Sequence, residues 1–240
     1  IKMVTSHYDF PVVQSRKGSE KMATIFITGS TGGLGSAIVE KFAENKDTLI
    51  LHYYQNKTKA LALKEEVEKK YQVKVFLVQA DFTKEEEIEQ MILTIKNNFS
   101  SLDTLINNAA FTFDCDFLDK TSDNIKKTFT VNFDAPLFLC KGLISLLKNS
   151  NNASIINISS NNALDCNYIE SVDYDASKAA LISLTHNLAA YLAPNIRVNA
   201  VCPGWINTKM NEDLSVDFIK QEQEKILLGR FAEPKEIAPL

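Results

Sequence analysis

Short runs of apolar and β-branched residues alternate with longer helix-like stretches from Ala23 onwards. The runs are nearly continuous in apolar character, which is typical of strands buried on both faces of a parallel sheet. We expect strands at Thr24–Thr28, Thr48–Tyr54, Val73–Ala80, Thr104–Asn107, Ser154–Ser159 and Arg197–Val201. Helices are expected between them, at Leu34–Asn45, Thr58–Tyr71, Lys84–Asn98, Asn124–Lys148 and Asp175–Ala193.

A strand followed by a helix, repeated along one chain, predicts right-handed βαβ crossovers. The expected fold class is therefore α/β: a doubly wound Rossmann fold with a central parallel sheet flanked by helices on both faces. In such a fold, ligands bind beyond the carboxyl ends of the strands, where the strand order reverses. The length of 240 residues suits one domain of this kind, which we place at residues 22–240. Residues 1–21 are polar and lack a clear period, so we interpret them as an N-terminal extension or an added tail.

A glycine-rich turn follows the first expected strand directly. Residues Thr28–Gly35 read TGSTGGLG and lead straight into a helix. Glycine permits a tight turn and the close approach of a pyrophosphate, and the helix N-terminus offers unpaired N–H groups to that anion. The spacing is GxxxGxG rather than GxGxxG, but the order of strand, turn and helix favours a dinucleotide site. The alternative is a glycine-rich turn without a ligand.

The end of the second expected strand bears on the choice of dinucleotide. A Rossmann domain that binds NAD often has an acidic residue there, on the ribose 2′-hydroxyl. Residues His52–Lys57 read HYYQNK, with no carboxylate and one lysine. We therefore expect NADP(H) to be favoured over NAD(H), while Lys57 could also simply face solvent.

Tyr174 and Lys178 lie four residues apart at the start of the last long helical segment. Positions i and i+4 share one helix face, so both side chains can point into the same cleft. A free tyrosine has a pKa of about 10, and a nearby ammonium would lower it. A phenol tuned in this way can give a proton to a carbonyl oxygen or take one from an alcohol. The pair by itself also occurs as an ordinary surface tyrosine and lysine.

Two more polar residues have positions that suit a site. Ser160 comes just after the fifth expected strand, where its hydroxyl could hold a substrate oxygen. Asn132 lies inside a long apolar helix, although asparagine is a mediocre helix former. We interpret Asn132 either as a hydrogen-bonding residue of the site or as a structural amide.

Together these motifs resemble the short-chain dehydrogenase/reductase family in its single-domain form, and within it the 3-oxoacyl-[acyl-carrier-protein] reductases. They follow the family's order over Ala23–Pro239: TGSTGGLG, Asp81, NNAA at Asn107–Ala110, Asn132, Ser160, Tyr174 with Lys178, and PGWINT at Pro203–Thr208. The resemblance implies an oxidoreductase that transfers a hydride between a nicotinamide and a carbonyl or secondary alcohol.

The resemblance also implies a role for each catalytic residue. Tyr174 would be the general acid/base, and Lys178 would lower its pKa and bind the nicotinamide ribose. Ser160, rather than its neighbour Ser159, would orient the substrate carbonyl. Asn132 would support Lys178 through a water-linked proton relay.

Cofactor contacts follow from the same resemblance. Asp81 would contact the adenine, Asn108 and Ala109 would line the cofactor, and the PGWINT segment would hold the nicotinamide end. The expected cofactor-binding set is Gly29, Ser30, Thr31, Gly33, Leu34, Gly35, Tyr53, Asp81, Phe82, Asn108, Ala109, Ala110, Tyr174, Lys178, Pro203, Gly204, Ile206 and Thr208.

The chain departs from the family pattern in three places. Ala110 stands where the family usually has glycine, and the sequence ends at Leu240, before the family's usual last strand. The stretch between Ser160 and Tyr174 is one residue longer than is common and lacks the usual glycine, which leaves the shape of the substrate loop open. The expected specificity regions are Ala163–Asp173 and Asn207–Glu224, the latter either a lid or an ordinary amphipathic surface helix.

Three functions are compatible with these residues. The leading hypothesis is an NADPH-dependent carbonyl reductase close to the 3-oxoacyl-[acyl-carrier-protein] reductases. A dehydrogenase of a sugar or small alcohol would use the same residues. A non-catalytic nucleotide-binding scaffold is the alternative of another class, and the intact set of four catalytic residues disfavours it.

Composition narrows the choice of partners. A net charge of −4 without a Lys/Arg stripe speaks against nucleic acid and against an anionic membrane surface. The four cysteines form no CxxC pair, so we expect no metal site and a reducing, cytoplasmic location. We expect a small-molecule substrate and a homo-oligomer, either a dimer or a tetramer. The apolar stretch Phe129–Leu147 could supply its interface or could pack on the sheet.

Overall fold

The structure is a computed structural model that describes residues 2–4, 22–165, 168–212 and 214–240. Its middle layer contains six parallel strands: β2 (Thr24–Ile27), β3 (Thr48–Tyr53), β4 (Val75–Gln79), β5 (Thr104–Asn107), β6 (Ala153–Ile158) and β7 (Ile196–Cys202). Their order across the sheet is β7-β6-β5-β2-β3-β4. This order confirms the expected doubly wound α/β fold, because β2 and β5 are neighbours at the point where the winding reverses.

One strand of the described residues has no counterpart in the sequence prediction. β1 (Lys2–Val4) pairs antiparallel with β7, with Lys2 opposite Cys202 and Val4 opposite Ala200. An edge strand exposes a row of unpaired backbone groups, and this pairing covers part of the β7 edge. The start of the N-terminal extension therefore contacts the sheet, while residues 5–21 lie outside the described residues.

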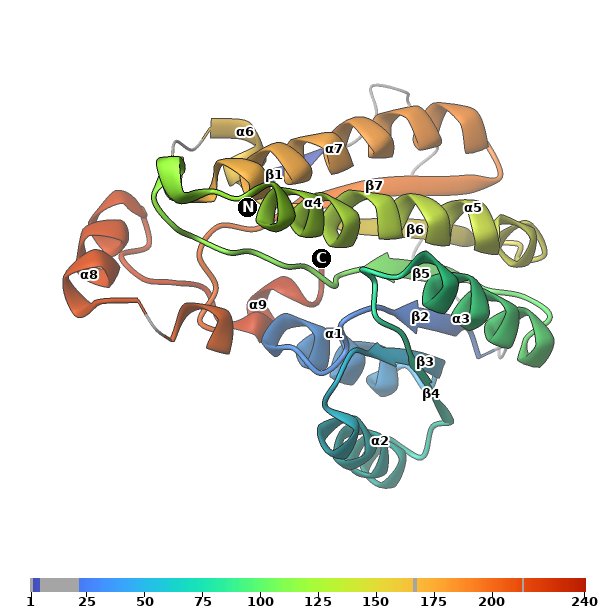
Figure 1. Cartoon of the computed structure of the whole chain (residues 1–240). Helices are drawn as coiled ribbons and strands as arrows, with labels where there is room; N and C mark the ends of the chain where they lie inside the picture. The colour runs from blue at the N-terminus through green and yellow to red at the C-terminus, as the bar shows by residue number, and fades with distance from the viewer. Residues whose placement is uncertain (1, 5–21, 166–167, 213) are drawn as a thin grey trace.

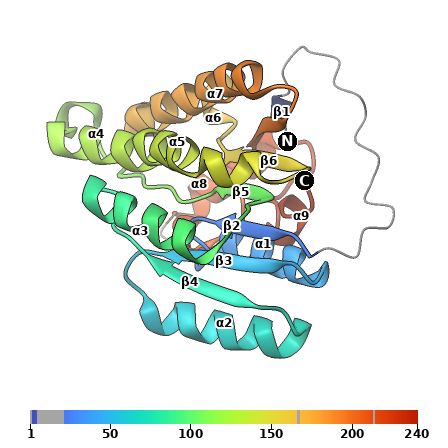
Figure 2. The ribbon, with the colours of Figure 1, turned by 90° about the vertical axis from the view of Figure 1, so that its right-hand side faces the viewer.

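Helices cover both faces of the sheet (Figures 1 and 2). One face carries α3 (Glu85–Asn98), α5 (Ala135–Lys148) and α7 (Val172–Leu192), and the other carries α1 (Gly33–Glu44), α2 (Lys57–Tyr71) and the short α9 (Pro234–Ile237). Successive residues of each strand point alternately into the two cores on either side of the sheet. Phe26 and Ile50 pack on the α3–α5–α7 side, whereas Ile25 and Leu49 pack on the α1–α2 side. Burial of both faces explains why the strands read as continuous apolar runs.

The expected helix at residues 124–148 is longer than predicted and is interrupted. α4 (Ser122–Phe129) is followed by a π-helical turn at Thr130–Asp134, after which α5 continues. Among the described residues, Ser122–Lys148 is the one helical stretch that length and composition alone would allow to cross a membrane. A buried core helix passes the same test, and here α5 packs Leu139, Leu143 and Leu147 into the core. The apolar face of this stretch is thus used within the chain.

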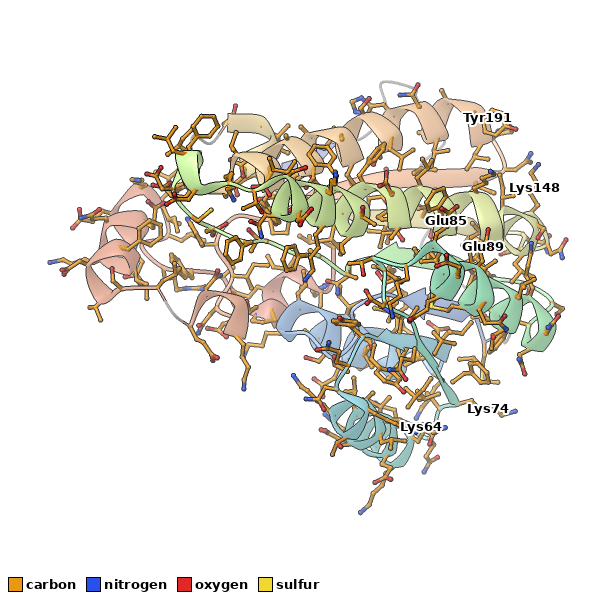
Figure 3. The ribbon with its side chains drawn as sticks, in the orientation of Figure 1. Lys64, Lys74, Glu85, Glu89, Lys148 and Tyr191 are labelled. Atoms are coloured by element: carbon orange, nitrogen blue, oxygen red, sulfur yellow. The ribbon has the colours of Figure 1, made fainter. Side chains whose placement is uncertain are left out.

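The strands point towards the end of the molecule at which α6 (Asn162–Asp165) and α8 (Val216–Lys225) lie (Figure 1). Lys148 and Tyr191, near the carboxyl ends of α5 and α7, lie at the opposite end (Figure 3). The segments that follow β2, β3, β4, β5, β6 and β7 therefore approach one another on the α8 side. All the motifs singled out from the sequence belong to those segments.

Candidate active site

The glycine turn, residues 28–35, connects β2 to α1 and packs against two other predicted motifs. Gly29 adopts a φ of +62°, and a Cβ there would lie 2.8 Å from the Cα of Ala109, so no other residue fits without strain. A Cβ on Gly33 would lie 2.7 Å from Cγ2 of Thr208. The structure thus brings the turn, the end of β5 and the segment at residues 203–208 together.

Backbone and side-chain groups after β5 hold this turn in place. Thr28 Oγ1 accepts hydrogen bonds from the backbone N–H groups of Asn108 and Ala109, both at 2.9 Å. The Asn108 amide donates to the carbonyl oxygens of Thr28, at 2.8 Å, and of Gly29, at 3.2 Å. The side-chain amide of Asn108 therefore holds the glycine turn in shape and does not extend into solvent.

The N-terminus of α1 is suited to an anion. No side chain caps it, and its first turn carries no acidic residue. Its unpaired N–H groups and the positive end of the helix dipole favour a phosphate, and the absent Cβ of Gly29 lets the backbone approach closely. The residues present therefore fit the pyrophosphate of a dinucleotide.

His52 is a residue of this region that the sequence analysis did not single out. Its buried ring accepts the N–H of Gly29 at Nδ1, at 3.1 Å, and donates from Nε2 to the Ala80 carbonyl, at 3.0 Å. The ring stacks on Phe82 with centroids 4.2 Å apart. Burial lowers the pKa of His52 to about 4, so the imidazole is neutral at neutral pH. A neutral histidine thus joins the glycine turn to the end of β4.

Several predicted cofactor contacts turn out to have inward-facing side chains. The Ser30 hydroxyl donates to the His52 carbonyl at 2.9 Å, and the Tyr53 hydroxyl donates to Gln79 Oε1 at 3.2 Å. Leu34 and Phe82 are buried in the protein. In this structure the Ser30 hydroxyl is thus used within the protein. The sequence prediction named these residues as cofactor contacts but did not give the direction in which their side chains point.

Asp81, the remaining predicted residue near the carboxyl ends of β3 and β4, is more accessible. The Asp81 carboxylate accepts hydrogen bonds from the N–H and the hydroxyl of Thr83, at 2.9 and 2.7 Å. A pocket of about 330 Å³ opens beside it, lined by Tyr54, Thr83, Lys126, Lys127 and Thr130. Two lysines therefore border the region in which the family resemblance places the adenosine.

Tyr174 and Ser160 meet as the sequence analysis expected. Tyr174 lies in the first turns of α7, and its phenol hydrogen-bonds the hydroxyl of Ser160. Ser160 Oγ also accepts the N–H of Asn162 at 3.2 Å. Ser159 faces away, because its hydroxyl donates to the Lys178 carbonyl at 2.9 Å. Of the two adjacent serines, Ser160 is the one that faces the phenol.

The pKa of Tyr174 differs from the sequence expectation. Burial raises it to about 12, and the hydrogen bond from Ser160 only partly offsets that rise. The fully buried ammonium of Lys178 lies 5.6 Å from the centroid of the Tyr174 ring, but it donates to the Ile158 carbonyl at 2.8 Å. Burial lowers the pKa of Lys178 to about 8. In this structure loss of hydration outweighs the hydrogen bond from Ser160, so the pKa of the phenol lies above its ordinary value and the lowering expected from Lys178 is not seen.

Asn132 lies in the π-helical turn and is almost completely buried. Its Nδ2 donates to the Phe111 carbonyl at 2.9 Å and to Ser177 Oγ at 3.0 Å, and its Oδ1 accepts the Phe111 N–H at 2.8 Å. π-helical turns are rare and are frequent at functional sites. The amide thus joins the segment after β5 to α7 between Tyr174 and Lys178.

A buried ion pair beside Tyr174 also escaped the sequence analysis. The Asp173 carboxylate lies 2.7 Å from the Lys120 ammonium, with side chains that are 2% and 3% exposed. Asp173 also accepts the Thr128 hydroxyl at 2.7 Å. These contacts fasten the start of α7 to α4 and to the loop that precedes it.

The segment at residues 203–208 closes the site from the β7 side. The Pro203 carbonyl accepts the N–H of Asn161 at 2.8 Å, which places Pro203 and Gly204 next to Ser160. Ile206 pairs with Ala232 in an isolated parallel bridge. Among the described residues, no group of three or more His, Cys, Asp or Glu side chains is placed to hold a metal ion.

Known proteins resemble this chain over most of its length. A family model described as short chain dehydrogenase matches residues 23–217. The chain is 36% identical over 213 residues to the 3-oxoacyl-[acyl-carrier-protein] reductase FabG of Aquifex aeolicus, covering 88% of this chain and 85% of that protein. It is 33% identical over 219 residues to carbonyl reductase family member 4 of Xenopus laevis, covering 91% and 88%. A crystal structure of a dehydrogenase/reductase from Sinorhizobium meliloti 1021 superposes with a TM-score of 0.84 at 32% identity, covering 90% of this chain and 85% of that one.

Proposed function

Since the chain belongs to the short-chain dehydrogenase/reductase family, we propose that it is a carbonyl reductase that uses NADPH. Membership makes it an NAD(P)-dependent oxidoreductase. The proposed substrate is a 3-oxoacyl thioester or a related ketone. The relatives named as a 3-oxoacyl-[acyl-carrier-protein] reductase and a carbonyl reductase support this choice.

The observation that carries the proposal is that the Tyr174 phenol and the Ser160 hydroxyl face each other at the end of β6. With a pKa of about 12, the phenol keeps its proton at neutral pH, which is the form that can protonate a carbonyl oxygen. When bound, the reduced nicotinamide supplies the hydride that adds to the carbonyl carbon. Tyr174 gives its proton to the oxygen, so the product is an alcohol, while Ser160 donates a hydrogen bond that holds the same oxygen.

Lys178 and Asn132 have supporting roles in this proposal. Lys178 Nζ lies beside the Tyr174 ring and donates to a backbone carbonyl at the end of β6. From there it would bind the nicotinamide ribose and stabilise the phenolate left after proton transfer. Asn132 holds α7 in register through Ser177, and we retain the water-linked relay to Lys178 as part of the proposal.

The cofactor would lie across the carboxyl ends of β2 and β5. The turn at residues 28–35 and the N-terminus of α1 would hold its pyrophosphate, Asp81 and Ala109 the adenosine side, and residues 203–208 the nicotinamide side. Tyr53 ends β3 and Tyr54 follows it, so no carboxylate there would repel a 2′-phosphate. Lys126 and Lys127 border the adjoining pocket. These features support NADPH, and we further propose that the active protein is a homo-oligomer.

The proposal is tested by measuring turnover of acetoacetyl-CoA with NADPH and with NADH, and oxidation of polyols with both oxidised cofactors. We expect turnover of the thioester and a higher kcat/KM with NADPH. Tyr174→Phe should bind NADPH as the parent protein does but should lose turnover by a factor of about 10² or more, because the proton donor is removed. Turnover that survives in this variant would remove Tyr174 from the mechanism, and polyol oxidation without thioester reduction would overturn the substrate class.

A further inference from the structure

Glu222 is the one buried residue among the ten of α8, all of which the structure describes. Its residue exposure is 3%, although it is charged and its helix is otherwise exposed or half-exposed. Burying a carboxylate is costly unless hydrogen bonds replace its water. A helix that packed only for stability would bury apolar side chains at such a position.

Three donors surround the Glu222 carboxylate. Oε2 accepts hydrogen bonds from the Tyr168 hydroxyl and from Nε1 of Trp205, the latter at 3.1 Å. Oε1 accepts one from Lys225, on the next turn of the same helix, at 2.6 Å. Both bonds that leave the helix therefore end on a single oxygen.

The two outside donors come from the two segments that border the substrate end of the site. Tyr168 belongs to the stretch between Ser160 and Tyr174, and Trp205 follows the Pro203–Gly204 turn. One carboxylate thus joins α8 to the serine–tyrosine stretch and to the nicotinamide side of the site.

Aromatic rings pack around this junction. Trp205 stacks on Phe231 at 5.4 Å and meets the edges of Tyr168 at 5.9 Å and of Phe218, from α8, at 5.6 Å. The Trp205 carbonyl also accepts the N–H of Ala232 at 2.9 Å, so the indole is fixed to the C-terminal segment. Trp205 is therefore held in place by the C-terminal segment, and Phe218 and Glu222 hold α8 against its ring.

We propose that Glu222 is a positioning residue that fastens α8 over the substrate end of the active site and thereby sets the affinity for the carbonyl substrate. The effect on substrate rests on the proposed function, whereas the fastening of α8 does not. Glu222 hydrogen-bonds to Tyr168, Trp205 and Lys225, none of which is among the proposed catalytic residues. Its loss should thus release α8 and weaken substrate binding while leaving cofactor binding as it is.

The kinetic test compares Glu222→Met with Glu224→Met, the same change at an exposed position of the same helix. Methionine keeps the volume but accepts no strong hydrogen bond. We expect Glu222→Met to raise KM for acetoacetyl-CoA about tenfold, because the hydrogen bonds that fasten α8 are lost, with kcat and the Kd for NADPH near the parent values. Glu222→Gln retains an acceptor and should restore much of the affinity. Unchanged KM in Glu222→Met, or an equal loss in Glu224→Met, would overturn the proposal.

A second measurement follows α8 without any turnover. Trp205 is the single tryptophan of the chain, so its fluorescence reports on this junction alone. In Glu222→Met we expect emission shifted to longer wavelength and faster tryptic cleavage after Lys220, which is exposed on α8. Glu224→Met should behave as the parent protein in both assays. If the thioester is not a substrate but these changes occur, the proposed function fails and the fastening stands; if neither signal changes, the fastening is overturned.

Discussion

The imidazole of His52 accepts the backbone N–H of Gly29, so a side chain from the end of β3 holds the glycine turn at the end of β2. The other ring nitrogen donates to the Ala80 carbonyl at the end of β4. Three neighbouring strand ends at the cofactor side are thus joined through one neutral ring. Since Gly29 adopts a left-handed conformation, its peptide needs such a partner to stay in place.

This hydrogen bond predicts that two substitutions of His52 have different effects on NADPH affinity. Asparagine places an acceptor near the position of Nδ1 and keeps the bond from Gly29, whereas glutamine places a donor near Nε2 and keeps only the bond to Ala80. Loss of the Gly29 acceptor should cost about 1–3 kcal/mol and raise the Kd for NADPH about tenfold or more. Titration by NADPH fluorescence should therefore show tight binding in His52→Asn and weak binding in His52→Gln. Equal affinities in the two variants would contradict the role of the Nδ1 contact.

The lowered pKa of the buried His52 ring predicts that the folded protein loses stability in acid. The pKa of His52 is lowered from 6.5 to about 4 in the folded state, so the unfolded chain takes up a proton first as the pH falls. The contribution to stability is complete above pH 6.5 and is lost progressively towards pH 4, by about 3 kcal/mol in all. Urea unfolding at several pH values should show this slope in the parent protein. His52→Asn should lack it, and parallel curves for the two proteins would contradict the assignment.

The paired serines at the end of β6 give a test with a built-in control. Ser160 faces the Tyr174 phenol, whereas Ser159 donates to the Lys178 carbonyl. Ser160→Ala should lower kcat/KM about 10²-fold, as expected when a donor to the reacting oxygen is removed, with little change in the unfolding free energy. Ser159→Ala should lose about 1 kcal/mol of stability and retain most activity. A larger loss of activity in Ser159→Ala would show that the two roles are exchanged.

Strands and long helices could be predicted from sequence because their signals are local. The expected strand at residues 104–107 matches β5 residue for residue, and the other strands differ by one or two residues at an end. β1 was missed because three residues at a sheet edge carry no period. The π-helical turn around Asn132 was missed because its neighbours still read as a helix.

Side-chain contacts between segments that are far apart in the sequence could mostly not be predicted. Ser160 was predicted because it follows a strand, and Tyr174 because it lies at the start of a helix four residues before Lys178; the structure joins the two. His52 was read only as part of a strand end, since nothing local shows that its ring meets Gly29. Glu222 looked like one charge among several on an exposed helix, because Tyr168 and Trp205 lie 54 and 17 residues away along the chain. The side-chain direction of Phe82 was likewise set by packing on His52 and not by its own neighbours in sequence.

We predict that breaking the ion pair of Lys120 with Asp173 strongly destabilises the protein, and that removing the second charge restores much of the stability. Both side chains are almost fully buried, so removing one leaves a buried charge without its partner, which costs about 3–5 kcal/mol. Lys120→Met and Asp173→Asn should each destabilise the protein by this order, and kcat should fall as well because Asp173 precedes Tyr174. The double variant should regain much of the loss, since neither charge is then left unpaired. Lys41→Met, which breaks an exposed pair with Glu44, should change the unfolding free energy little. Additive losses in the double variant would mean that the two buried side chains act independently, and the start of α7 would then be held by the Thr128 bond to Asp173 rather than by the ion pair.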